Sequence, residues 1–317
     1  MLPKGTLLQR RYRIEELLGQ GGMSQVYLAT HLGLARRVAI KMLQQLSRDP
    51  KEQWKFVERF QEEARILAAL NHPNLAAIMD LFMDQQLPYL VMEFIQGRTL
   101  EAIVELAPRR LSQRRVLAWA AQLLDVLEYV HSRNPPVIVR DLKPANVMLG
   151  EDNRLRLIDF GLARLLTPGG RTQAIVKGMG SEGYAPLEQY GRATTDQRTD
   201  IYGLGGTLFF LLSGQHPPEA PSRVGQPDPP VPEDNPTVTR EVWSAILKLM
   251  ALYPHERPQN VAEARALLGL TSSEHRCVNC GARLHSELRE GIGVESCPAC
   301  GGCWLDRGEF EKLTRRA

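Results

Sequence analysis

Three polar residues lie close together in the segment VIVRDLKPANVML, which runs from Val137 to Leu149. The carboxylate of Asp141 can accept a hydrogen bond from a substrate hydroxyl, and Lys143 can neutralise negative charge that develops nearby. The side-chain oxygen of Asn146 is a hard ligand of the kind that magnesium prefers. The types and spacing of these residues suit the transfer of a phosphoryl group.

A glycine-rich stretch, LGQGGMSQVYLA, contains Gly19, Gly21 and Gly22 between two expected strands. Because glycine has no Cβ, backbone N–H groups in such a turn can approach phosphate oxygens closely. Taken alone, the stretch is equally consistent with a plain hairpin turn. Ser24 also stands where the pattern G-x-G-x-x-G would have its third glycine.

Lys41 lies in the apolar segment RRVAIKML. It needs an anionic partner, because burying an unpaired ammonium group is costly. Glu63, on the helix expected next, is a suitable partner. Its neighbour Glu62 points about 100° away on the same helix, so only one of the two can face the strand.

Hydrophobic periodicity predicts the elements that must position these side chains. Alternating apolar residues predict three antiparallel strands in YRIEELL, SQVYLATH and RRVAIKML. A helical period follows from about Pro50 to Leu70, and LPYLVMEFI returns to strand. GRTLEAIV begins a helical region, in which three long segments carry apolar residues at helical spacing. Residues 216–237 are rich in proline and are expected to form a surface loop. The pattern therefore predicts a strand-rich lobe followed by a helical lobe.

Residues 10 to about 270 resemble a protein kinase domain of the eukaryotic-like bacterial serine/threonine type. The resemblance is carried by the glycine-rich stretch, VAIK, RDLKPAN and IDFGLA, which occur in the family's order. It implies an α+β bilobal protein kinase fold for residues 1–270, with a β-rich N-lobe at about 10–93 and an α-helical C-lobe at about 94–270. ATP, Mg²⁺ or Mn²⁺, and protein substrates are the ligands that this family implies.

The resemblance also assigns catalytic roles. Asp141 would aim a substrate hydroxyl in line at the γ-phosphate, and Lys143 would stabilise the transferred group. Asn146 and Asp159 would bind magnesium, and Gly161 permits the sharp turn after Asp159.

For the nucleotide, the resemblance implies that Lys41 contacts the α- and β-phosphates and that Glu63 holds Lys41 in place. Met92 would be the gatekeeper beside the adenine. The other nucleotide-binding positions implied are Gly19, Gln20, Gly21, Gly22, Val26, Ala39, and Glu93 and Ile95 of the hinge.

Two residues favour serine or threonine over tyrosine as the acceptor: Lys143 in DLKPAN and Ser181 in GSEGYAPLEQY. By the same resemblance, Glu188 would pair with Arg257, and Asp200 would anchor the backbone of the catalytic loop. We assign structural roles to these last three residues.

Val139 stands where the family has a histidine that packs beside the IDFG segment and carries no proton in the reaction. Since valine can fill much of that space, we expect an active kinase. The competing hypothesis is an ATP-binding pseudokinase scaffold whose C-terminal module recruits partners, supported by Val139 and Ser24. Arg140 is of the type that binds a phosphorylated activation loop, for which Thr172 is the favoured site.

All five cysteines lie in the last 41 residues. They predict a separate module at 277–317, after a linker at 271–276. Two C-x₂-C turns separated by 16 residues suit a closed, structural zinc site. A disulfide, a redox pair, and ligation by His275 or His285 are the alternatives. The expected ligands are Cys277, Cys280, Cys297 and Cys300.

The tail CPACGGCWLDRGEFEKL resembles the zinc-ribbon family related to the transcription-factor ribbon, with Cys303 at a variable position. We expect this module to offer a surface for a protein partner or a substrate. A formal net charge of +3 gives no strong field that would favour nucleic acid or a membrane surface. No apolar run reaches the roughly 18 residues of a membrane span, and the expected location is the cytoplasm.

Overall fold

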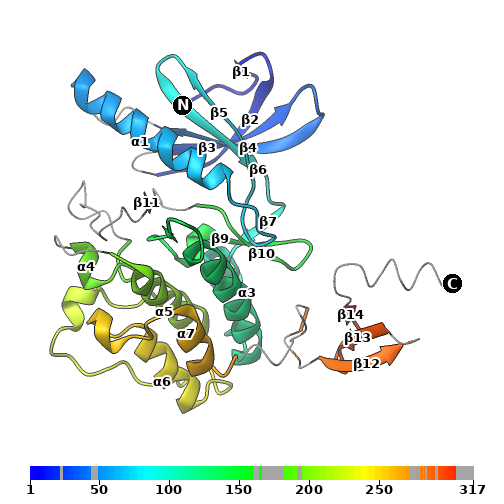
Figure 1. Ribbon diagram of the computed structural model, residues 1–317, viewed down its shortest axis with the longest axis vertical. Coiled ribbons are helices and arrows are strands. Elements are labelled where there is room, and N and C mark those ends of the chain that lie inside the picture. The colour runs from blue at the N-terminus through cyan, green and yellow to red at the C-terminus, as the bar shows by residue number, and fades with distance from the viewer. Residues whose placement is uncertain are drawn as a thin grey trace.

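The structure is a computed structural model. It contains two lobes and a small separate sheet (Figure 1). The residues described are 1–21, 24–43, 49–159, 164–165, 181–190, 195–270, 277, 279–280, 282, 284–289 and 292–304. Among them, no helix combines the length and the apolar character needed to cross a bilayer.

The N-terminal lobe is a six-stranded antiparallel sheet with the strand order β1-β2-β3-β4-β6-β5. Helix α1 (Pro50–Ala68) lies against strands β5 and β6. The three predicted antiparallel strands and the helix after them are present, so the expected strand-rich first lobe is confirmed. The strands are β1 (Leu7–Leu8), β2 (Tyr12–Gln20), β3 (Ser24–His31), β4 (Arg36–Leu43), β5 (Ile78–Asp84) and β6 (Leu87–Glu93).

Alternation along β4 separates two apolar clusters. Val38 and Ile40 are fully buried on one face of the sheet. Ala39 and Leu43 belong to the cluster on the other face, which contains Phe60 and Ala64 of α1. Because side chains alternate with period two, Lys41 points to the same face as Ala39 and Leu43.

The second lobe is helical, as predicted, and α5 forms its centre. Every residue of α5 from Thr199 to Ser213 is buried, because α3 and α6 pack around it. Its first turn is capped by Asp196, whose carboxylate accepts a hydrogen bond from the Arg198 N–H. The helices are α2 (Leu100–Leu106), α3 (Gln113–His131), α4 (Leu187–Tyr190), α5 (Gln197–Ser213), α6 (Arg240–Leu249) and α7 (Val261–Leu267), with short 3₁₀ turns at Ala220–Arg223 and Pro254–Glu256.

Short strands hold the loop that carries Asp141, Lys143 and Asn146. The loop leaves β8 (Val137–Ile138), passes through a 3₁₀ turn (Pro144–Asn146) and enters β9 (Val147–Gly150). At its two ends it is therefore fixed by strand pairing. β9 lies between β7 (Gly97–Thr99) and β10 (Leu155–Leu157), and β8 pairs with β11 (Arg164–Leu165).

The C-terminal module contains an antiparallel sheet in the order β12-β13-β14, drawn beside α3 in Figure 1. Its strands are β12 (His285–Arg289), β13 (Ile292–Ser296) and β14 (Cys303–Trp304). The C-x₂-C turns at Cys277 and Cys297 precede and follow the β12–β13 hairpin. The sheet therefore brings two cysteine pairs that are distant in sequence to one end of the module.

Candidate active site and cysteine cluster

Strand register places the predicted nucleotide-binding residues on one face of the N-terminal sheet. Val26 of β3 pairs with Gly19 of β2 on one side and with Lys41 of β4 on the other. Ala39 pairs with Met92 of β6. Directly paired residues share a face, as do residues two apart in one strand. The five side chains or Cα atoms therefore form one continuous surface beside α1.

The glycine turn between β2 and β3 is open on its outer side. Among the described residues, a Cβ built on Gly19 would meet no atom within 4 Å, and one built on Gly21 would meet the Ser24 carbonyl oxygen alone, at 3.9 Å. Protein packing therefore gives no reason for glycine at Gly19, whereas close approach of a ligand does. Gln20 is exposed at the end of β2, and Gly22 lies outside the described residues.

The segment expected to form the hinge follows β6. The Glu93 N–H donates to the Ala77 carbonyl oxygen at 2.8 Å, which fixes the backbone where the two lobes join. Ile95 is buried, and the Glu93 side chain lies 3.8 Å from Arg156 Nε. Glu93 is thus contacted at its backbone N–H by Ala77 and at its side chain by Arg156 of the second lobe.

Lys41 reaches across to the second lobe. Its Nζ lies 2.6 Å from Asp159 Oδ2, in the segment directly after β10. Lys41 thus has an anionic partner, as its position in an apolar strand requires. The side chain of Glu63 and the residue Gly161 lie outside the described residues, so the pairing of Lys41 with Glu63 stays a prediction.

The loop residue Asp141 is surrounded by hydrogen-bond donors. Its Oδ1 accepts a hydrogen bond from Ser181 Oγ at 2.7 Å, and its Oδ2 accepts one from Asn146 Nδ2 at 2.9 Å. Lys143 Nζ lies 3.0 Å from the same carboxylate and also donates to Ser181 Oγ. The structure therefore brings a carboxylate, an ammonium group and a serine hydroxyl into mutual contact.

Asn146 and Asp159 both carry side-chain oxygen atoms, the donor type that magnesium prefers. The Nδ2 group of Asn146 donates to both the main-chain oxygen and the carboxylate of Asp141, which leaves its amide oxygen as the ligand atom. The Ile158 N–H donates to the Asn146 carbonyl oxygen at 2.9 Å and ties the segment before Asp159 to the loop. Two oxygen ligands on adjacent segments match the preference of Mg²⁺.

Asp200 of α5 holds the backbone of the loop. Its two carboxylate oxygens accept hydrogen bonds from the Val139 and Arg140 N–H groups, at 2.9 and 2.7 Å. Arg140 has a φ of 68°, a conformation that non-glycine residues rarely adopt unless their surroundings impose it. His131, which sequence reasoning missed, lies with its Nε2 2.7 Å from Asp200 Oδ2. The sequence signal for it was a histidine at the end of the apolar stripe that forms α3.

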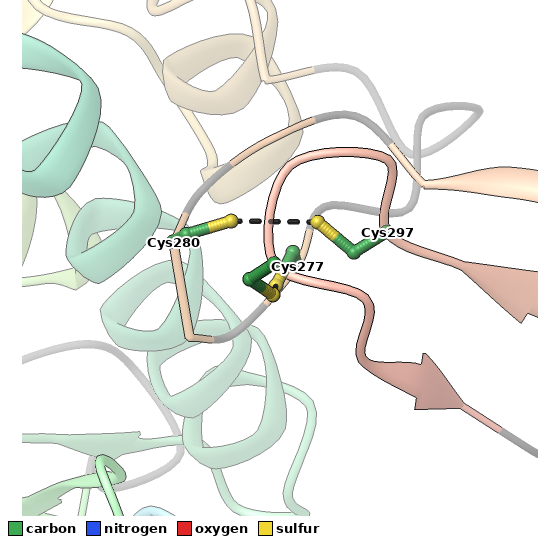
Figure 2. Close-up of side chains that lie close together, drawn as sticks. Cys277, Cys280 and Cys297 are labelled. Carbon is green, nitrogen blue, oxygen red and sulfur yellow. Dashed lines mark hydrogen bonds between the residues drawn. The ribbon is translucent and has the colours of Figure 1, made fainter.

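The four predicted cysteine ligands form one cluster. Their sulfur atoms all lie within 4.8 Å of one another. Figure 2 shows three of them, with Cys280 facing Cys297 across the cluster. The Cys277–Cys300 and Cys280–Cys297 sulfur separations are both 3.4 Å. A disulfide requires about 2.05 Å, whereas tetrahedral zinc with Zn–S bonds of about 2.3 Å places its sulfur atoms about 3.8 Å apart.

The first cysteines of the two turns lie in different electrostatic environments. Burial raises the pKa of the Cys277 thiol to about 12. Burial also opposes ionisation of Cys297, but the backbone N–H groups of Ala299 and Cys300 outweigh it and lower the pKa of this thiol to about 6. A bound cation deprotonates coordinating thiols outright, so both extremes are compatible with a metal. Cys303 is exposed and lies outside the cluster.

Residues 12–259 match the family described as protein kinase domain, and residues 276–316 match the transcription factor zinc-finger family. The chain belongs to the protein kinase family. The kinase match spans both lobes, and the zinc-finger match covers the cysteine cluster. The resemblance to the two families, inferred from the motifs, is therefore confirmed.

The curated relatives of this kinase are bacterial serine/threonine kinases. The chain is 39% identical over 275 residues to serine/threonine-protein kinase PknB of Mycolicibacterium smegmatis, a match that covers 82% of this chain and 42% of the relative. It is 34% identical over 287 residues to serine/threonine-protein kinase pkn2 of Myxococcus xanthus, covering 86% of this chain and 34% of the relative. The matched part thus spans less than half the length of these relatives.

Two solved structures have the same fold as the kinase domain. One is the apo form of PpkA-294, with a TM-score of 0.70 and 26% identity, covering 84% of this chain and 99% of that one. The other is a variant of the PknI kinase domain of Mycobacterium tuberculosis, with a TM-score of 0.66 and 25% identity, covering 85% and 98%. The bilobal fold predicted from the motifs is confirmed.

A buried ion pair supports the kinase domain below the active site. Arg257 Nη1 and Nη2 donate to the two carboxylate oxygens of Glu188 at 2.6 and 3.0 Å, and the two side chains are 0% and 5% exposed. Thr199 Oγ1 also donates to Glu188, and Arg257 donates to three carbonyl oxygens. The pairing of Glu188 with Arg257 that the resemblance implied is therefore present.

Replacing Arg257 with alanine should destabilise the kinase domain by roughly 3–5 kcal/mol, because Glu188 would remain buried without its partner. Urea unfolding followed by near-ultraviolet circular dichroism measures the loss. Arg265→Ala is the matched control, since Arg265 pairs with the largely exposed Asp125 and should cost about 1 kcal/mol or less. Equal losses for the two variants would contradict the assignment.

Proposed function

We propose that this chain is an ATP-dependent protein serine/threonine kinase that transfers the γ-phosphoryl group of Mg-ATP to protein hydroxyls. The observation that carries the proposal is the contact of Asp141 with Ser181 Oγ and Lys143. A carboxylate that accepts a hydrogen bond from a serine hydroxyl has the interaction that an acceptor serine or threonine needs. A carboxylate offers about four lone-pair positions, so room for a substrate hydroxyl remains.

In this proposal Asp141 orients the attacking hydroxyl and accepts its proton, and Lys143 stabilises the charge on the transferred group. Asn146 and Asp159 hold the divalent cation through oxygen atoms. Magnesium, or manganese in its place, supplies neutralisation of charge on the phosphate oxygens when it is bound. The side chains of the protein hold the substrate hydroxyl, the phosphoryl group and the cation in position.

Lys41 binds the α- and β-phosphates, together with the backbone N–H groups of the glycine turn. When Mg-ATP binds, the Lys41–Asp159 contact would break, and Lys41 would contact the phosphates while Asp159 contacts the metal. The apolar surface of Val26, Ala39 and Met92 supports the adenine, and the backbone from Glu93 to Ile95 borders it. A pseudokinase scaffold is not favoured, since residues for the hydroxyl, the metal and the phosphates are all present.

For the C-terminal module we propose one structural Zn²⁺ held by four thiolates. Such a closed site has no open position for a substrate. The module therefore stabilises its own fold and offers a surface for a protein partner or for substrate docking. Cysteines that are ligands and are not joined in disulfides suit a reducing compartment such as the cytoplasm.

The purified chain, incubated with Mg-ATP and a generic protein substrate, should incorporate phosphate into serine and threonine. Phosphoamino-acid analysis identifies the acceptor, and Asp141→Asn sets the background. Incorporation no higher than this background would count against the proposal. Phosphotyrosine as the main product would overturn the assigned acceptor class.

A further inference from the structure

The first cysteine turn contacts the kinase C-lobe at two points. Arg114 Nη2, at the start of α3, donates to Cys280 Sγ at 3.6 Å. Asn153 Nδ2, in the turn between β9 and β10, donates to Asn279 Oδ1 at 3.3 Å. Figure 2 shows Cys280 on the side of the cluster nearest the C-lobe helices. Because the two donors come from different elements, together they fix the orientation of the cysteine turn.

The contact region between the kinase C-lobe and the first cysteine turn, called the seam below, is polar. A cavity of about 340 Å³ lies there, and its polar lining comes from Ser112, Arg114, Arg115, Asn153 and Asn279. The guanidinium of Arg115 stacks over the Trp119 ring at 4.7 Å, which keeps a second positive charge at the seam. A polar seam with room for water depends on hydrogen bonds and charge more than on apolar packing.

The cysteine cluster supplies the complementary charge. Four thiolates bring more negative charge than one Zn²⁺ neutralises, so a loaded cluster is anionic. The Arg114 guanidinium is always charged, and its hydrogen bond to a thiolate is stronger than one to a neutral thiol. A donor to a metal-bound sulfur is also a group that tunes metal affinity.

We propose that the C-lobe surface formed by Arg114 and Asn153 is a docking site for this chain's own first zinc turn. Zinc binding and docking then stabilise each other, because each strengthens the Arg114–Cys280 contact and the coupling is reciprocal. This inference rests on the proposed zinc site. In this proposal Arg114 is a positioning residue. It holds the C-terminal module against the surface of the kinase domain formed by α3 and the β9–β10 turn.

The test is Arg114→Gln in the full chain, with Arg109→Gln as the matched control. Arg109 is exposed before α3, and its substitution removes the same charge a few positions away. Zinc content is measured first, and then the rate of zinc transfer to a chromogenic chelator. We expect Arg114→Gln to release zinc about tenfold faster than the wild-type protein, and Arg109→Gln to match the wild type.

Hydrogen exchange of residues 112–119 gives an independent readout of docking. In the wild-type protein, zinc removal should speed exchange in this segment, whereas in Arg114→Gln it should change nothing further. An Arg114→Gln protein that holds about one zinc, releases it at the wild-type rate and keeps the wild-type exchange response overturns docking alone. A wild-type chain without zinc overturns the zinc site and the docking together.

Discussion

Replacing Asp141 with asparagine should lower kcat for phosphoryl transfer by roughly 10²–10⁴-fold. The substitution keeps the shape of the side chain but replaces one oxygen acceptor with a donor. Both oxygens of Asp141 accept hydrogen bonds in the structure, from Ser181 and from Asn146. The variant therefore loses one acceptor and also the group proposed to take the proton from the attacking hydroxyl. Initial rates of phosphate incorporation at saturating Mg-ATP measure the effect.

The control for this variant is Asp125→Asn on α3. Asp125 is 53% exposed and pairs with Arg265, away from the loop, so its removal should leave kcat unchanged. Thermal unfolding of both variants should match that of the wild-type protein, which separates loss of chemistry from loss of fold. An Asp141→Asn rate within about tenfold of the wild-type rate would contradict the role of Asp141.

The N-terminal strands were predictable because alternation of apolar residues is local information. At the start of β2, burial alternates as the pattern requires, since Tyr12 and Ile14 are buried and Arg13 between them is exposed. Strand β5 was not predicted. Its residues, Ile78 to Asp84, are all half-buried, so the sequence shows no contrast between an inner and an outer face.

The catalytic loop was predictable from its motif. Asp200, which holds its backbone in place, was predicted, and His131, which contacts Asp200, was not. The resemblance to the kinase family gave the role of Asp200, whose carboxylate binds the Val139 and Arg140 N–H groups. Those bonds go to the backbone, and for that reason valine in place of histidine at Val139 leaves the loop anchored. The contribution of His131 depends on how α3 packs beside α5, which periodicity alone does not encode.

Contacts between distant segments were the least predictable. Lys41 and Asp159 are 118 positions apart and lie in different lobes, so their contact depends on how the lobes are positioned. Arg114 and Cys280 are 166 positions apart, and an arginine on a helix surface carries no sequence signal for a sulfur partner. Thr172, favoured as a phosphorylation site, and the alternative ligand His275 lie outside the described residues.

Removal of zinc should unfold the β12–β14 sheet while the kinase domain stays folded. A module of this size cannot bury enough apolar surface to fold alone. In small zinc fingers, metal binding contributes roughly 10–16 kcal/mol of apparent free energy, which is also the free energy of folding. The kinase domain has its own continuous core around α3 and α5 and does not depend on the metal. Amide NMR spectra recorded before and after chelation should lose dispersion only for residues of the C-terminal module.

Two cysteine variants sharpen this prediction. Cys297→Ser removes a ligand from the cluster and should reproduce the effect of chelation, because a hydroxyl binds zinc much more weakly than a thiolate. Cys303→Ser changes an exposed cysteine outside the cluster and should retain both zinc and the folded sheet. A reducing agent without chelator should also leave the sheet intact, because in the proposed site a metal and not a disulfide joins the two turns. Persistence of the sheet in zinc-free Cys297→Ser protein would show that packing alone stabilises the module.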